Sequence, residues 1–526
     1  MRIPITIAVA TAMVVSLAAC TSESPDSEQA LIDGGTFTMA ISADPGALDP
    51  AFATTGVTHQ LQQFLYDSLV NVDADGSLVA GLAHNWEGTA TEASFTLREG
   101  VTCSDGSALT ATDVAANINF VANPENQSTR MGTFVPPMAE ATADDGAGTV
   151  TITSQVPDAF LVQNIGSLLI VCGAGLDDRE SLAQGAVGTG MFVLDEAVAD
   201  DHYTLTRRDD YAWGPGDWTG GPTGLPDTVV LRVVSSETTA ANLLLEGSVN
   251  VASLSGPDQQ RLGGQDLTEH ELLTPLGWLW FNQAEGLPGE DEDVRRALVQ
   301  VLNLEELGTA LSGGLGKASQ SLVVAGLGPC DVDTVSDNLP AHDPGAGTSA
   351  LETAGWKLSD GKLMKDGEQM TITFLYPTSY GASMAAGAEL LASTWGELGI
   401  DVVTRGTTDV EGSQIIIGGQ GSWDATFLPI GITLPSQIAP FLAGPTPPDG
   451  ANFAAIDNAD YMAAVGAAST TPGADGCDSW AAAEESLVSA VDVVPFVDSV
   501  TVFYGTGTSF ELIQGSVAPT SIRMLG

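Results

Sequence analysis

The sequence is poor in positively charged residues. Its 526 residues include 16 Lys plus Arg against 67 Asp plus Glu, which gives a formal net charge of −51 at pH 7. The lysines are Lys317, Lys357, Lys362 and Lys365. So acidic a surface repels phosphate backbones and anionic lipid headgroups, and these lysines cannot build a basic patch. The composition therefore argues against nucleic acid as a partner.

The sequence also lacks the short motifs of metal and catalytic sites. Its cysteines form no Cys-x-x-Cys pair and its histidines no His-Glu-x-x-His motif, which argues against zinc and redox sites. No Gly-x-Ser-x-Gly nucleophile elbow occurs. A Gly-rich run ends in Lys317, but Leu311 and Ala318 stand where a phosphate-binding loop needs Gly and Ser or Thr. The residues thus predict no catalytic site, metal site or cofactor.

Long apolar runs are missing beyond the N-terminus, where residues 3–19 form one behind Arg2. Such a run is shorter than a membrane span and predicts an export signal. Its ending, Leu17-Ala18-Ala19-Cys20, resembles the bacterial lipobox, in which signal peptidase II cleaves before a cysteine whose thiol carries a diacylglycerol. We therefore expect a signal peptide over residues 1–19 and a lipidated polar tether over residues 20–33, anchored through Cys20. An ordinary secretory signal that contains a cysteine is the alternative.

Cysteines are few in the exported body: Cys103, Cys172, Cys330 and Cys477. An even number outside the cytosol predicts two disulfides, for which three connectivities are possible. Four unpaired buried thiols are the alternative.

Apolar patterns along the body alternate between strand and helix periods. Residues 36–41 alternate with period two and predict a strand, whereas residues 57–69 and 110–120 carry helical spacing. Residues 294–307 also have helical spacing and follow four carboxylates, at 290–293. Acidic residues at a helix start complement the helix dipole, which we prefer to acid–base chemistry as their interpretation. The patterns predict a mixed α/β protein.

Several local strings follow one another in an informative order. Among them are Gly34-Gly35-Thr36-Phe37-Thr38, Leu65-Tyr66-Asp67-Ser68-Leu69-Val70, Leu82-Ala83-His84-Asn85-Trp86, Cys103-Ser104-Asp105-Gly106-Ser107, Val187-Gly188-Thr189-Gly190-Met191-Phe192, Arg207-Arg208-Asp209-Asp210-Tyr211 and Asp293-Val294-Arg295-Arg296-Ala297-Leu298. The series resembles the family 5 extracellular solute-binding proteins of ABC importers, the oligopeptide, dipeptide and nickel-binding class. The resemblance extends to Asn458-Ala459-Asp460-Tyr461.

The resemblance implies a two-lobed α/β fold of the periplasmic-binding-protein type, class II, enlarged by an extra subdomain in lobe I. We expect lobe I over residues 34–275 plus 492–526 and lobe II over residues 276–491. The chain would then cross the hinge twice, and the lobes would close over a ligand. Bridges within each lobe leave closure free, so this layout favours Cys103–Cys172 and Cys330–Cys477.

The same resemblance places the ligand site between the lobes. The residues expected there are Ser42, Ala43, Asp44, Trp278, Trp280, Tyr380, Trp423 and Asp424. Core packing is the alternative for the two hinge tryptophans, and a structural role is our preferred interpretation of Asp424. Peptide binders of the family hold the ligand ammonium with an acidic residue, but residues 431–436 read Gly-Ile-Thr-Leu-Pro-Ser. The missing carboxylate argues against peptide binding.

These features together predict a lipid-anchored, monomeric solute-binding protein on the extracytoplasmic face of a bacterial cell membrane. It would capture a short peptide or other small organic solute and deliver it to ABC permease subunits and their ATPases, without a cofactor. A secreted lipoprotein hydrolase, or a sensor or adhesin on the same fold, are the alternatives. The sequence leaves the identity of the ligand open.

Overall fold

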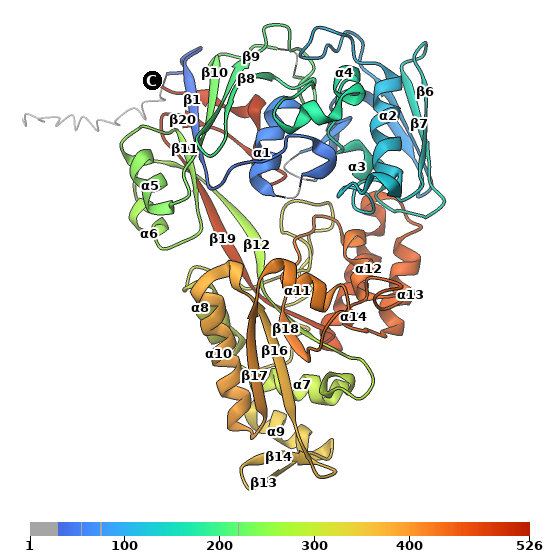
Figure 1. Cartoon of the computed structure of the whole chain (residues 1–526), viewed down its shortest axis with the longest axis vertical. Helices are drawn as coiled ribbons and strands as arrows, with labels where there is room; N and C mark the ends of the chain where they lie inside the picture. The colour runs from blue at the N-terminus through green and yellow to red at the C-terminus, as the bar shows by residue number, and fades with distance from the viewer. Residues whose placement is uncertain (1–29, 54, 74–75, 219) are drawn as a thin grey trace, which may run out of the picture.

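The computed structural model describes residues 30–53, 55–73, 76–218 and 220–526. A mixed sheet of parallel and antiparallel strands forms the centre of the protein (Figure 1). Its ten strands occur in the order β17-β16-β18-β12-β19-β11-β1-β10-β9-β8. Their bounds in that order are Asp401–Thr407, Thr371–Pro377, Ala425–Phe427, Thr268–Phe281, Val493–Gly505, Val251–Leu254, Thr36–Ile41, Thr228–Val233, His202–Arg207 and Phe192–Val198.

Two long antiparallel strands in the middle of this sheet, β12 and β19, connect the two lobes (Figure 1). At one end they join β11 and the strands beyond it, which form the first lobe. At the other end they join β18, β16 and β17, which form the second lobe. Their pairing shifts register around Gly277, where an added Cβ would collide with Phe496 and Val497 of β19. A glycine is therefore needed where the strands cross between the lobes.

The first lobe carries its helices on both faces of the sheet and adds a smaller sheet. That sheet has the order β4-β5-β7-β6, with bounds Ala83–Gly88, Glu92–Leu97, Thr149–Thr153 and Glu140–Asp144. The helices are α1 (Gly56–Leu65), α2 (Ala111–Ala122), α3 (Leu161–Gly166), α4 (Gly173–Asp177), α5 (Glu237–Leu245) and α6 (Gln259–Leu262). Thr110 and Asp113 form a capping box that starts α2, as the acidic and threonine residues there predict.

The second lobe buries both faces of its part of the sheet. Successive residues of β12 alternate, so Leu279 and Phe281 pack in one core and Trp278 and Trp280 in another. The first core is covered by α7 (Glu292–Gln300), α8 (Leu304–Ser312), α9 (Pro344–Thr353) and α10 (Gly381–Glu397). The second is covered by α11 (Asp409–Ile416), α12 (Ala439–Leu442), α13 (Ala459–Ala468) and α14 (Cys477–Ser489).

Short strands complete the fold. They are β2 (Val70–Val72), β3 (Leu78–Ala80), β13 (Lys357–Ser359), β14 (Lys362–Lys365), β15 (Glu368–Gln369), β20 (Thr508–Ser509), β21 (Leu512–Ile513), β22 (Ser516–Val517) and β23 (Arg523–Met524). No helix in the described ranges is both long enough and apolar enough to cross a membrane.

Most of the expected elements form, with one clear error. The strand at residues 36–41 is confirmed, and the helix expected from residue 57 to 69 ends at Leu65. The single helix expected over residues 294–307 is wrong, because the chain forms α7 and α8 instead. Asn303 breaks the run by accepting a hydrogen bond from the Glu306 amide, which starts a new helix. The expected signal peptide and Cys20 lie outside the described residues.

Both expected disulfides are present. Cys103 is bonded to Cys172 within the first lobe, and Cys330 to Cys477 within the second. Neither bond joins the lobes, so neither restricts the movement of one lobe against the other.

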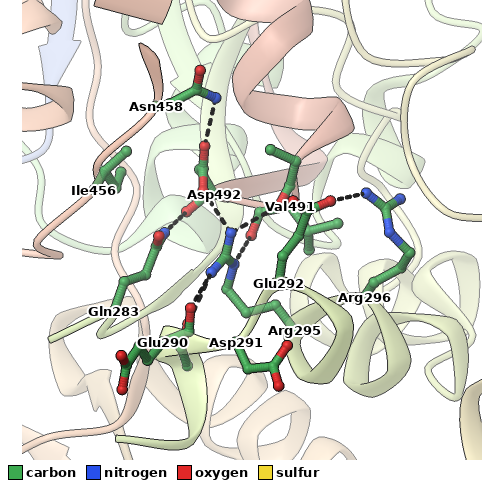
Figure 2. Close-up of polar contacts among 12 residues, drawn as sticks. Gln283, Glu290, Asp291, Glu292, Arg295, Arg296, Ile456, Asn458, Val491 and Asp492 are labelled. Atoms are coloured by element: carbon green, nitrogen blue, oxygen red, sulfur yellow. Dashed lines mark hydrogen bonds and ion pairs between the residues drawn. The ribbon is translucent and has the colours of Figure 1, made fainter. Parts of the chain in front are cut away.

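A buried arginine holds the end of α14 in the second lobe (Figure 2). Arg295 of α7 donates to the carbonyl oxygens of Ala490 and Val491, just after α14, and to the carboxylate of Asp492 at 2.8 Å. Asn458 donates to the second Asp492 oxygen, also at 2.8 Å. The side chains of Arg295 and Asp492 are only 5% and 4% exposed. The pair thus fixes the start of β19 to α7, with most of its polar groups satisfied inside the protein.

The neighbouring arginine is a matched control for this buried pair. We expect Arg295→Ala to lower the free energy of unfolding by about 3–5 kcal/mol, because it leaves the Asp492 charge buried without its positively charged partner. Arg296 pairs with Glu292 at a partly exposed position, so Arg296→Ala is expected to cost about 1 kcal/mol or less. Chemical denaturation followed by circular dichroism measures both. Equal losses in the two variants would contradict the structural role of Arg295.

Candidate functional site

A cavity of about 300 Å³ lies where the two lobes meet. The first lobe contributes α1, α3, the β2 hairpin and the segment from Arg130 to Phe134. The second lobe contributes Thr433, Leu434 and Gln437. Its volume is at the small end of the range for ligand pockets, which favours a small solute over a long peptide.

Helix α1 presents a neutral histidine to the cavity. Thr55 caps this helix, and His59 and Gln63, one turn apart, both line the cavity. The amide nitrogen of Gln63 lies 2.9 Å from Nε2 of His59, and because an amide N–H can only donate, Nε2 accepts and the ring proton sits on Nδ1. Burial, aided by the charge of Arg130, lowers the pKa of His59 to about 4. The imidazole is therefore uncharged at neutral pH, and its buried Nδ1 has no hydrogen-bond partner among the described residues.

Helix α3 contributes two amides to the cavity. Asp158 accepts hydrogen bonds from the backbone N–H of Phe160 and the side chain of Asn164, which fixes the start of the helix. Gln163 is only 8% exposed, and its side chain lines the cavity. Asn164 accepts from Gln437 of the second lobe at 3.5 Å, a long hydrogen bond that crosses the cavity.

Arg130 carries the positive charge of this cavity. It is half-buried, its Nε donates to the Pro50 carbonyl at 3.3 Å, and its guanidinium lies 5.0 Å from the centre of the Phe134 ring. Burial lowers the pKa of Arg130. Among the described residues that line the cavity there is no Asp or Glu, so hydrolysis by a carboxylate pair has no group to use there.

The lobes touch each other beside the cavity. Phe160 of the first lobe lies against Trp480 of α14, with ring centres 6.2 Å apart. The Gly473 amide donates to the Ala159 carbonyl at 2.8 Å, close to the same contact. Phe160 and Trp480 belong to one buried cluster with Cys330, which is disulfide-bonded to the start of α14. This contact holds the two walls of the cavity together.

A second cavity, of about 370 Å³, lies at the carboxyl ends of β16, β17 and β18. Open α/β sheets usually bind their ligands at this end of the strands. Tyr380 lines the cavity and is 44% exposed, and burial, followed by the charge of Asp409, raises the pKa of its hydroxyl. Tyr380 is thus the one residue of the predicted ligand set that lines either of these two cavities.

The other predicted ligand residues lie elsewhere in this structure. Ser42 and Ala43 are exposed after β1, and the Asp44 carboxylate accepts from Tyr203 and from the Asp200 amide. Trp278 and Trp280 are 0% exposed in the core, and Trp423 is buried in the same cluster. Asp424 accepts from the Thr373 amide between strands. In this conformation these side chains are either packed inside the protein or exposed to solvent. Their contact with a ligand stays a prediction.

The residues that do line the interlobe cavity were not predicted from the sequence. His59 and Gln63 lie one turn apart on one face of α1, and Arg130 is a rare cation in an acidic chain. These residue types could have indicated a binding site, but nothing in the sequence shows that α1 and the segment around Arg130 lie close together in the fold. No group of three or more His, Cys, Asp or Glu side chains in the described ranges is placed to hold a metal ion.

Comparison with known proteins agrees with this architecture. The family model of bacterial extracellular solute-binding proteins, family 5 (middle), matches residues 77–442. A Brucella ovis protein named as an ABC transporter peptide-binding protein is 23% identical over 407 residues, which are 74% of this chain and 71% of that protein.

Two solved structures are also similar. A substrate-binding protein from Microbacterium hydrocarbonoxydans, solved with 4-hydroxybenzoate hydrazide, is 28% identical with a TM-score of 0.71, over 93% of this chain and 99% of that one. The oligopeptide-binding protein AppA from Bacillus subtilis, solved with a nonapeptide, is 17% identical with a TM-score of 0.72, over 94% of this chain and 100% of that one. The family match covers more than half of the sequence, and the two-lobed α/β fold agrees with it. The chain therefore belongs to family 5 of the bacterial extracellular solute-binding proteins, the binding components of ABC transporters.

Proposed function

We propose that this protein is the lipid-anchored receptor of an ABC importer, which captures a small organic solute between its lobes and presents it to the permease. The observation that carries the proposal is the interlobe cavity, whose walls come from both lobes and are lined mainly by amides and apolar groups. A ligand held by both walls is bound only while the lobes are together. Binding would therefore stabilise the conformation that the permease subunits recognise.

The proposed movement uses β12 and β19 as the two connections between the lobes. We place lobe I at about residues 34–275 plus 492–526 and lobe II at about residues 276–491, with the chain crossing between them near residues 274–282 and 493–501. The register shift around Gly277 and the contact between Phe160 and Trp480 support a hinge at the strands and a closing surface at α14. The bound molecules of the similar structures, an aromatic hydrazide and a peptide, support a small organic solute or short peptide as ligand.

The proposed anchor would hold the first lobe near the membrane. Leu31 and Ile32, at the start of the described chain, pair with the C-terminal residues Leu525 and Met524. A tether that ends there leaves the second lobe free to move. The protein would work as a monomer with the permease subunits and, through them, their ATPases.

The function is tested by purifying the protein natively and identifying co-purified molecules by mass spectrometry. A panel of peptides, sugars, amines and organic acids is then added to the ligand-free protein. A true ligand is expected to raise the melting temperature and reduce the radius of gyration in small-angle scattering, because it binds the native state between the lobes. If no co-purified or added compound changes either quantity, the proposed function is wrong.

The contact between Phe160 and Trp480 gives a test of closure. Phe160→Ala is expected to weaken ligand binding by up to about 10-fold, because losing an aromatic pair worth about 0.5–1.5 kcal/mol makes the closed form less populated. The radius of gyration of the ligand-free protein should increase. Phe52, which pairs with Phe120 inside the first lobe, provides the control Phe52→Ala. Unchanged affinity in Phe160→Ala, or the same loss in both variants, would contradict this closing role.

The lipid anchor is tested at Cys20. In a bacterial host that lipidates its proteins, the natural chain is expected in the membrane fraction, with a diacylglycerol mass on its N-terminal peptide. Cys20→Ser should move the protein out of that fraction, because serine has no thiol to modify. Retention of Cys20→Ser in the membrane fraction would show that the anchor is elsewhere.

A further inference from the structure

Among the described residues Arg130 has no ion-pair partner, although the chain contains 67 Asp and Glu residues. Within the described residues no carboxylate lies within ion-pair distance of its guanidinium, whereas Arg179, Arg208 and Arg295 each have an aspartate partner. Arg130 is also half-buried, so less water is available to solvate its charge. A cation in such a place is stabilised by an anion that arrives from outside.

The groups beside Arg130 add hydrogen-bond donors without adding charge. The ring of His59 is neutral, and its N–H at Nδ1 has no acceptor among the described residues. Gln163 is buried in the same wall, and its side-chain amide is a neutral group that can donate to a ligand. A cation with neutral donors is the environment that an anionic oxygen prefers.

Two described carboxylates close to this wall, Asp67 and Asp158, already accept hydrogen bonds inside the first lobe. Asp67 lies in a small adjoining cavity, where its oxygens accept from the Tyr211 hydroxyl and the Trp213 indole. Asp158 is bonded to the Phe160 amide and to Asn164. Neither is free to bind the ammonium group of a peptide or amine, and Thr433, Leu434 and Gln437 bring no carboxylate from the second lobe.

We propose that the cavity recognises its solute through a carboxylate, so that the transported class is small organic acids with an apolar body. The inference rests on the proposed function and names the ligand class of the same site. Arg130 binds the carboxylate, and the donors on α1 and α3 complete its coordination. The apolar body lies against Val70, Phe134 and Leu434, which line the same cavity.

The overall charge of −51 does not oppose this assignment at close range. Charges on the outer surface are screened beyond a Debye length of about 8 Å at physiological ionic strength. A partly desolvated arginine acts inside that distance, and its planar guanidinium can bind both oxygens of a carboxylate. The surface charge therefore slows the approach of an acid, whereas Arg130 determines which solute stays bound.

The proposal is tested with matched probes by isothermal titration calorimetry. A panel of aryl and alkyl monocarboxylates, including benzoate and 4-hydroxybenzoate, is compared with the primary amide and the amine of the same body. The best acid is expected to bind about 10- to 100-fold more tightly than its amide, the usual strength of a hydrogen bond to a charged group. Its amine should not bind measurably.

Three variants assign the preference to Arg130. Arg130→Gln should remove the difference between acid and amide, and Arg130→Lys should keep part of it, since lysine retains the charge without the planar fork. Arg232, exposed on β10 and without an ion pair in the described chain, gives the charge-matched control Arg232→Gln, which should bind like the natural protein. Circular dichroism confirms that each variant is folded, and the comparison of acid with amide in the natural protein needs no variant.

The outcomes separate this inference from the function on which it rests. Compaction with a dipeptide, an amine or an amide, with no acid bound more tightly, would overturn the carboxylate assignment and leave the solute-binding role standing. An acid preference that survives in Arg130→Gln would also overturn it. Failure of every probe and of every co-purified molecule to bind would overturn both.

Discussion

The paired strands β12 and β19 are the constraint on which the rest of the structure depends. Each strand begins in one lobe and ends in the other, so the two lobes share one hydrogen-bonded ladder. Such a ladder resists shear and stretching but can bend where its register shifts, around Gly277. The cavity lies where the surfaces of the two lobes meet.

The chain has few positively charged residues, and its individual arginines have different roles. Arg295 has a structural role, because it joins α7 to the end of α14 and neutralises a buried aspartate. Arg130 lines the cavity, and none of the described residues that line it with Arg130 is a carboxylate. The acidic surface and the arginine in the cavity are therefore different properties of one chain, and the net charge does not identify the ligand.

The sequence predicted those structural features that depend on residues close to one another in the chain. Thr110 caps α2, and this boundary could be predicted because capping depends on neighbouring residues. The break at Asn303 was missed because apolar spacing continues through it. The cavity could not be predicted, since α1, the Arg130 segment, α3 and residues 433–437 are distant in sequence. Trp278 and Trp280 were expected at the hinge as candidate ligand contacts, but the core that their face meets depends on helices that come much later in the chain.

The central claim is that one ligand is held by both lobes at once. Hydrogen–deuterium exchange of the natural protein, with and without its co-purified ligand, measures this most directly. The account predicts slower exchange on ligand binding in α3 of the first lobe and in residues 433–437 of the second, together. Protection confined to one lobe, or absent from both segments, would contradict it.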